Sequence, residues 1–333
     1  MRRTELLVYV LAAGLGLTTG VLGTRWAAAY ATSSTSDEPA AIVTSSRSPE
    51  PLRPAPEQWE EMVSKMEHLS IRHNGRVAIY LKDLRGGREW TYHPDDLFPS
   101  ASLIKLPVMA CVFNRMKEGG LTLDTPMTLR RRERVGGSGR LKWAADGTRY
   151  TVREVLERMI TESDNTAMRM LLDEVGFDYF ARGFTGNLGL TYTQIHPEGL
   201  SLDNRRIPNE NYTTAREMGG LLERMYHGQL VDRFSSEMML EYMKGLKTRK
   251  RLARALPVGW QLAHKTGLLR GACHDVGIVM TPQGEYVLAV LTGQNASYKD
   301  AKDFIEKLAA TSYRYMRLDS DIARANVAPA AIR

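Results

Sequence analysis

Ser102 and Lys105 stand three residues apart in an otherwise apolar run, FPSASLIKLPVM (98–109). Residues at this spacing share one face of a helix, so the lysine amine could lie beside the serine hydroxyl. A serine hydroxyl is a poor nucleophile at neutral pH and needs a neighbouring base to take its proton. The same residues would also suit one turn of a buried helix, and about one S-x-x-K is expected by chance in a chain this long. The pair alone leaves both interpretations open.

Two further motifs favour the chemical interpretation. SDN (163–165) lies at the start of a predicted helix, and KTG (265–267) ends a predicted strand. By composition, each tripeptide has a chance expectation of about one in ten or less. The ordered set S-x-x-K, S-D-N, K-T-G is that of penicillin-binding proteins and class A β-lactamases. The separations, about sixty residues and then about one hundred, also agree with that set.

Residues 57 to 317 resemble class A β-lactamases and their serine-hydrolase relatives. SDNTAMRMLL is similar to the helix that carries the second motif, and HKTGLLRGACHDVGIV resembles the strand pair that borders the cleft. GGSGRLK (136–142) resembles the Gly-Ser-Gly turn between the first two motifs and lacks the phosphate-loop pattern. The resemblance implies an α/β (α+β) chain of the β-lactamase/transpeptidase-like fold: an antiparallel sheet flanked by helices, with an inserted all-helical subdomain.

The resemblance also implies a role for each motif residue. The nucleophile would be Ser102, with Lys105 as its base and Ser163 as the proton relay to the leaving nitrogen. One oxyanion donor would be the Ser102 N–H, and the second would come from Leu269 or close to it. Asp164 would support its loop or cap the following helix. The remaining substrate-binding residues would be Asn165 for the acyl amide, Lys265 and Thr266 for a carboxylate, and Gly267 for the strand edge.

One family feature is missing. Class A β-lactamases carry a Glu-x-x-Leu-Asn segment, whose glutamate activates the water that clears the acyl-enzyme. The corresponding region here reads IHPEGLSLDNRRIPNEN (195–211), and neither Glu198 nor Glu210 matches that pattern. Glu198 is the better-placed candidate for a deacylation base, but a glutamate on a surface loop is the favoured interpretation.

Three hypotheses for function follow. The one we favour is β-lactamase-type hydrolysis of β-lactam amides through an acyl-enzyme. The alternative is a D-Ala-D-Ala peptidase-like or other cell-envelope serine hydrolase, acting on a peptidoglycan stem peptide and acylated by penicillins. The third is a non-catalytic sensor that binds β-lactams. No cofactor is implied, and no metal, because the seven histidines show no ligand spacing.

The positions of the predicted elements place the motifs. Strands are expected over 76–84, 88–93, 260–267, 274–281 and 285–293, and helices over 57–69, 102–117, 152–161, 165–175, 214–227 and 299–316. Strands at both ends of the chain predict a sheet portion from 57–97 and 250–318, with a helical portion, 98–249, inserted between them. The cleft is expected between the two portions, and residues 319–333 form a tail.

The N-terminus predicts export. Arg2 and Arg3 precede an uncharged apolar run (6–23), which is typical of a membrane anchor or a signal peptide, with cleavage near Ala31 as the alternative. A Ser/Pro-rich linker (32–56) follows. The protein is therefore expected on the extracytoplasmic side of the cell envelope, bound to the membrane by residues 1–31 or released from it, and as a monomer.

Charge and cysteine content limit the remaining classes. The net charge is +7, and the basic runs 130–134 and 247–251 have no interleaved aromatic residues. Both runs are interpreted as solvated faces, and nucleic acid is not expected as a partner. Cys111 and Cys273 are the only cysteines, so the chain is no small disulfide-framed domain. Whether the two pair is left open.

Overall fold

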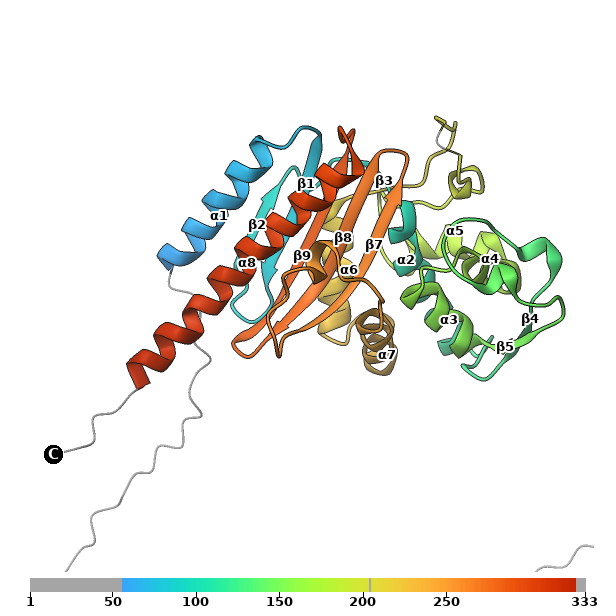
Figure 1. Ribbon diagram of the computed structural model, residues 1–333. Coiled ribbons are helices and arrows are strands. Elements are labelled where there is room, and N and C mark those ends of the chain that lie inside the picture. Colours follow the sequence, from blue (N-terminus) through green and yellow to red (C-terminus); the bar gives the residue numbers. More distant parts are fainter. Residues whose placement is uncertain (1–55, 204, 328–333) are drawn as a thin grey trace, which may run out of the picture. The chain divides into compact units, whose positions relative to one another are not determined.

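The computed structural model describes residues 56–203 and 205–327, with side chains to residue 316 (Figure 1). The predicted anchor or signal segment (1–31) and almost all of the predicted linker (32–56) lie outside the described residues. Among the helices that are described, none combines the length and the apolar character needed to cross a membrane.

A five-stranded antiparallel sheet is built from both ends of the described chain. Its strand order is β2-β1-β9-β8-β7, so the first two strands pair with the last three, as the sequence predicts. β7 is an edge strand and carries the KTG motif. The strands are β1 (Arg76–Asp83), β2 (Glu89–Tyr92), β7 (Gln261–Leu269), β8 (Ala272–Thr281) and β9 (Gly284–Gly293).

Helices cover both faces of this sheet. α1 (Pro56–Ile71) and α8 (Tyr298–Val327) lie side by side on one face, and α6 (Ala215–Tyr226) packs on the other (Figure 1). Successive side chains along β1 point to opposite faces of the sheet. Ile79 is buried with the α1 and α8 side chains, and Tyr80 is buried in the cluster that contains the inserted helices. Because both faces are covered, the central strands are buried almost continuously.

The helical portion is inserted between β2 and β7. Of the two clusters of buried side chains in the described chain, the larger joins α2, α3 and α4 to the inner face of the sheet. Short strands pair within this region, β3 with β6 and β4 with β5. Its elements are β3 (Phe98–Pro99), α2 (Lys105–Lys117), β4 (Pro126–Thr128), β5 (Arg149–Thr151), α3 (Val152–Thr161), α4 (Asn165–Val175), α5 (Phe177–Gly186), β6 (Tyr212–Thr213) and α7 (Arg233–Lys244).

Two helix bounds differ from prediction: the start of α2, at the first motif, and the end of α8. Ser102 lies in a 3-10 turn, Ala101–Ile104, and α2 begins at Lys105 rather than at Ser102. α8 continues to Val327, beyond the predicted helix end at residue 316, because residues 317–327 contain neither glycine nor proline to stop it.

Candidate active site

The lysine of the first motif is the centre of the site. Lys105 is buried, and its Nζ lies 2.6 Å from both the Ser163 carbonyl oxygen and Asn165 Oδ1. The same nitrogen lies 3.2 Å from Ser163 Oγ and 3.4 Å from Ser102 Oγ. Two of these four oxygens can only accept hydrogen bonds, and two are hydroxyls that can also donate. A neutral amine can serve this set, since its two N–H groups can donate to the pure acceptors and its single lone pair can accept from one hydroxyl at a time.

Burial changes the acidity of this amine. Removal from water lowers the pKa of Lys105 to about 7, and the buried Asp164 carboxylate opposes that shift only in part. A substantial fraction of Lys105 is therefore neutral near neutral pH, and a neutral amine can accept a proton.

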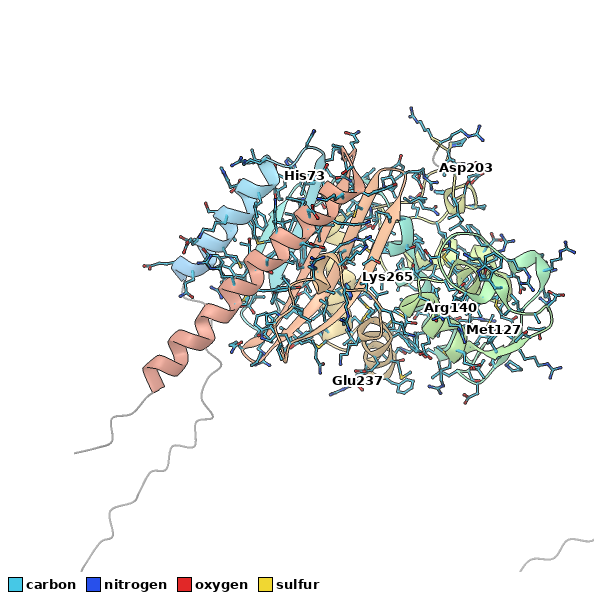
Figure 2. The ribbon with its side chains drawn as sticks, viewed as in Figure 1. His73, Met127, Arg140, Asp203, Glu237 and Lys265 are labelled. Atoms are coloured by element: carbon cyan, nitrogen blue, oxygen red, sulfur yellow. The ribbon has the colours of Figure 1, made fainter. Side chains whose placement is uncertain are left out.

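The second and third motifs meet at one hydroxyl. Lys265 Nζ donates to Ser163 Oγ at 2.9 Å, so this oxygen lies between the two lysines. Lys265 is fully buried at the boundary between the sheet and the helical portion (Figure 2). Burial, followed by the nearby charges of Lys105 and Arg251, lowers the pKa of Lys265. A bound anion would favour the protonated form of Lys265, because an opposite charge offsets these effects.

Backbone conformations around the cleft are unusual. Ala101, Ser163 and Arg270 have φ values of 47°, 53° and 49°, in the left-handed region that residues other than glycine seldom adopt. Ala101 precedes the nucleophile, Ser163 is the first residue of the SDN motif, and Arg270 follows Leu269. Such conformations persist only where surrounding contacts enforce them, and they concentrate at functional sites.

The glycine-rich segment packs directly on the SDN motif. Asn165 Nδ2 donates to the Gly136 carbonyl at 2.9 Å, and Asp164 accepts from the backbone N–H groups of Leu141 and Ala167, both at 2.9 Å. Asp164 is therefore both the N-cap of α4 and a support for the neighbouring loop. A Cβ at Gly139, whose φ is 94°, would lie 2.1 Å from Asp164 Cγ, so only glycine fits this approach.

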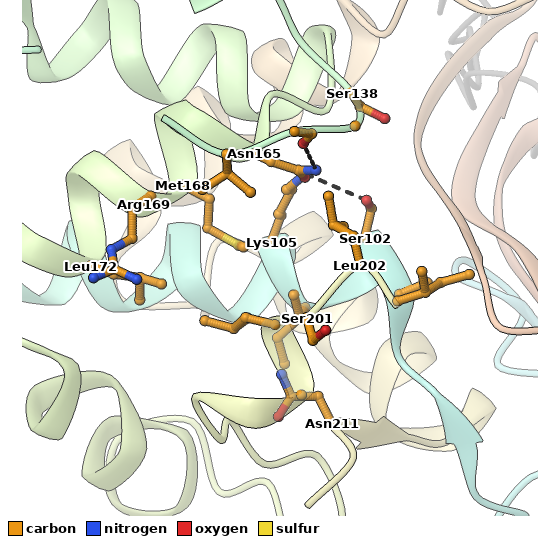
Figure 3. Close-up of a pocket in the computed structure, with 18 of the residues that line it drawn as sticks. Ser102, Lys105, Ser138, Asn165, Met168, Arg169, Leu172, Ser201, Leu202 and Asn211 are labelled. Carbon is orange, nitrogen blue, oxygen red and sulfur yellow. Dashed lines mark hydrogen bonds between the residues drawn. The ribbon is translucent and has the colours of Figure 1, made fainter. Parts of the chain in front are cut away.

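A cavity of about 690 Å³ opens beside these residues (Figure 3). The cavity is lined by Ser102, Lys105, Asn165 and Leu269. The hydrogen bond from Lys265 to Ser163 joins β7 to the other motif residues. Thr266 and Gly267 follow Lys265 on that strand, and a Cβ at Gly267 would lie 3.3 Å from the Ala101 Cβ. The structure thus brings S-x-x-K, S-D-N and K-T-G together.

The predicted deacylation candidate lies apart from this group. Glu198 is exposed, and its neighbours Pro197 and Gly199 line the cavity instead. The carboxylate of Glu210 forms a buried ion pair with Arg270. Among the described residues that line the cavity there is no aspartate or glutamate, whereas Lys105, Arg134 and Arg169 supply positive charge.

Two basic residues were misjudged from the sequence. Arg251 belongs to a run interpreted as a solvated face, yet it is buried, and its Nη1 donates to the His274 carbonyl at 3.0 Å. Arg134, from the other run, lines the cavity and donates to the Lys142 carbonyl at 2.6 Å. An interrupted charge run gives no local signal that one of its members turns inward; the contacts that bury these arginines come from other elements.

Arg270 ties the 199–210 segment to the β7–β8 turn. All five N–H groups of its guanidinium have acceptors, two on Glu210 and three on backbone carbonyls. The carbonyls belong to Gly199, Ser201 and Asp203, at 3.3, 2.8 and 2.7 Å. Arg270 therefore fixes the segment that forms one wall of the cavity.

Replacing Arg270 with alanine is expected to loosen this wall. Breaking a buried pair from one side costs about 3–5 kcal/mol, because the remaining charge stays without compensation. Amide hydrogen exchange of the 199–210 segment should then rise strongly, while that of α4 should not. Arg205→Ala, at an exposed position of the same segment, is the matched control. Unchanged exchange of the segment in Arg270→Ala would contradict this role.

Comparison with known proteins agrees with the site. The family described as the β-lactamase enzyme family matches residues 61–316. A β-lactamase of Streptomyces fradiae is 28% identical over 264 residues, which cover 76% of this chain and 85% of that protein. The carbapenem-hydrolyzing β-lactamase KPC of Klebsiella oxytoca is 27% identical over 249 residues, covering 72% of this chain and 82% of that protein.

Solved structures give the same result. A β-lactamase from Sphaerobacter thermophilus superposes with a TM-score of 0.71 at 25% identity, covering 78% of this chain and 98% of that chain. PBP-A superposes with a TM-score of 0.70 at 27% identity, covering 80% and 98%. A mutant of PBP-A was solved as an acyl-enzyme complex with penicillin G.

The fold and site define a serine hydrolase with a β-lactamase/transpeptidase-like architecture. The chain belongs to the β-lactamase enzyme family. Its reaction is of the serine β-lactamase type, and the comparisons favour hydrolysis over the peptidase-like and sensor alternatives.

Proposed function

We propose that the protein hydrolyses β-lactam amides through an acyl-enzyme on Ser102. The observation that carries this proposal is the position of Lys105 Nζ, a buried amine 3.4 Å from Ser102 Oγ and 3.2 Å from Ser163 Oγ. One amine thereby connects a nucleophile to a second hydroxyl that can pass on a proton. The net positive charge of the described cavity lining also suits an anionic substrate such as a penicillin.

Acylation needs three proton transfers. Neutral Lys105 takes the Ser102 proton as Oγ forms a bond to the lactam carbonyl carbon. The lactam C–N bond then breaks as Ser163 gives its proton to the leaving nitrogen, and protonated Lys105 restores the Ser163 proton. The 3.4 Å contact is long for this transfer, but such contacts commonly shorten when substrate binds.

The developing oxyanion would lie between the Ser102 N–H and the free edge of β7. Arg270 and Gly271 form a two-residue turn with positive φ at both positions, which is the type I′ geometry. Such a turn is closed by a hydrogen-bonded pair, here Leu269 and Ala272, so the Leu269 N–H faces β8. Alternation then directs the Leu268 N–H to the cleft. We therefore assign the second donor to Leu268, adjacent to the residue named from the sequence.

A substrate carboxylate would bind at the β7 end of the site. Lys265 and Thr266 supply an amine and a hydroxyl there, and the Arg251 charge acts on Lys265 from behind the strand. Asn165, whose Nδ2 faces the Gly136 carbonyl and whose Oδ1 faces Lys105, would hold the acyl amide at the other end.

Deacylation is expected to be the slow step. Water attack on the ester needs a base, and the described cavity lining offers no carboxylate for it. The cavity wall from which such a base would have to reach the ester is lined instead by the apolar Leu200 and the amide Asn211. Turnover of a penicillin should therefore show a rapid burst of acylation followed by a slow steady state.

A pair of assays tests the proposal. Nitrocefin hydrolysis should be measurable and catalytic, whereas release of D-alanine from a peptide ending in D-Ala-D-Ala should be absent or far slower. Efficient D-alanine release without nitrocefin turnover would overturn the β-lactam assignment in favour of the peptidase-like alternative.

Acylation should depend on pH through Lys105. The neutral amine is the base, and the pKa of Lys105 is about 7, so the labelling rate should fall about tenfold for each pH unit below that value. Above it the rate should level off. The second-order rate of labelling by a fluorescent penicillin, measured between pH 5.5 and 8.5, checks this expectation. A flat profile across neutral pH would contradict a base role for Lys105.

We also propose that the chain works on the extracytoplasmic side of the cell envelope, as a monomer. The support is the sequence alone: Arg2 and Arg3 before the apolar run 6–23, and a Ser/Pro-rich stretch after it. Fractionation of cells that express the full chain would test the location, since recovery in the cytoplasmic fraction is the contrary result.

A further inference from the structure

One face of α4 forms a continuous wall of the cavity. Asn165, Met168, Arg169 and Leu172 follow the i, i+3, i+4, i+7 spacing of a single helix face, and all four line the cavity. At 1.5 Å per residue the stripe extends about 10 Å beyond Asn165. Figure 3 shows Met168, Arg169 and Leu172 in a row on one side of Lys105, leading away from Ser102.

The opposite wall of the cavity contributes three apolar side chains. Pro197, Leu200 and Leu202 line the cavity from the segment that Arg270 ties to the sheet. The space between α4 and this segment is therefore bounded by a helix on one side and by a fixed loop on the other.

A second cavity continues the first along α4. It measures about 570 Å³ and shares four lining residues with the first, Arg169, Leu172, Pro197 and Leu200. Beyond them it reaches Phe177.

The second cavity is also lined by Arg132, Arg169 and Asp173, whose charges pair with one another. Arg169 Nε donates to Asp173 Oδ1 at 2.8 Å, and Arg132 lies 4.0 Å from the other oxygen of the same carboxylate. The shared passage is lined by the apolar residues Leu172, Pro197 and Leu200 and by Arg169, whose guanidinium is held by Asp173.

We propose that the two cavities form a channel for an elongated apolar acyl chain. The inference rests on the proposed function, in which Ser102 and Asn165 hold the scissile carbonyl and the acyl amide. The part of the substrate beyond that amide would then lie along the α4 stripe. The preferred substrates are then β-lactams, or related amides, whose acylamino group carries an unbranched alkyl chain of roughly the length of the stripe.

Penicillins that differ only in this chain provide the test. The second-order rate of adduct formation is measured by intact-mass spectrometry for N-acetyl and N-octanoyl 6-aminopenicillanic acid, so slow deacylation does not enter. Burial of one methylene is worth roughly a fourfold gain, so the octanoyl compound should react at least about thirtyfold faster even if only part of its chain is buried.

A substitution in the shared passage should remove this preference. Leu200→Trp narrows the connection between the cavities, and the octanoyl-to-acetyl ratio should fall to within about threefold of one. Leu97→Trp, at an exposed position that lines neither cavity, is the matched control and should keep the wild-type ratio. Phe177→Ala, at the far end, should shift the preference toward a dodecanoyl chain.

The outcomes separate the two proposals. Adduct formation at equal rates for the two chain lengths in the wild type overturns the channel and leaves the acyl-enzyme intact. A preference that neither Leu200→Trp nor Phe177→Ala alters, with thermal unfolding unchanged, also overturns the channel. No adduct with any penicillin contradicts the proposed function itself.

Discussion

Ser102→Ala is expected to abolish covalent labelling by a fluorescent penicillin while the thermal unfolding midpoint stays close to that of the wild type. The side chain is half-buried in the cleft, and its Oγ has Lys105 Nζ as its described hydrogen-bond partner, at 3.4 Å. Removing the oxygen removes the only atom that can form the ester under this mechanism. Labelled protein on a denaturing gel, together with a thermal melt, checks both expectations.

A matched control and a rival outcome sharpen this test. Ser64→Ala, at an exposed position of α1, should label like the wild type. Ser163 is the other hydroxyl within reach of Lys105, at 3.2 Å. Labelling that survives in Ser102→Ala and disappears in Ser163→Ala would show that Ser163 is the nucleophile and Ser102 the proton relay.

Lys105→Ala is expected to slow acylation by about 10²–10⁴-fold, the usual contribution of a positioned general base. Lys105→Arg should be impaired by a comparable factor, because a guanidinium keeps the charge but does not lose its proton near neutral pH. The pair of variants thus separates proton transfer from simple charge. The rate of adduct formation in rapid-quench experiments is the measurement. A Lys105→Arg rate within about threefold of the wild type would show that charge alone suffices.

Local sequence signals predicted most elements of the fold. α3 and α4 have the predicted bounds because each begins at a capping residue: Thr151 and Asp164 accept hydrogen bonds from the N-terminal turns of these helices. α5 was missed, since its FDYFARGFTG sequence combines aromatic residues with two glycines, which have low helix propensity. Burial of Phe180 and Phe184 stabilises that helix, and this contact is invisible to local pattern.

α7 was also missed, although a signal for it exists. Asp232 caps its first turn by accepting from the Ser235 N–H, and the segment RFSSEMMLEYMK contains mostly helix-forming residues. The short strands β3 to β6 have two or three residues each and depend on their partners, so periodicity could not reveal them.

The motifs predicted the centre of the site but not its surroundings. Ser102 and Lys105 meet because they are one turn apart, and this follows from spacing alone. Arg270 and Glu210 meet across sixty residues of chain, and only the folded path of the 199–210 segment pairs them. Glu198 is exposed on its loop, which agrees with the interpretation favoured from the sequence.

The most direct test of the acyl-enzyme account is a time course of intact mass. The protein is mixed with a small excess of penicillin G, the excess is removed, and the mass is followed over hours, with peptide mapping of the adduct. The account predicts one adduct of the full penicillin mass on the peptide that contains Ser102, formed rapidly and lost slowly as the hydrolysed penicillin appears. The absence of any adduct, or an adduct on a different residue, would contradict the acyl-enzyme account, whereas loss of the Ser102 adduct within seconds would contradict slow deacylation.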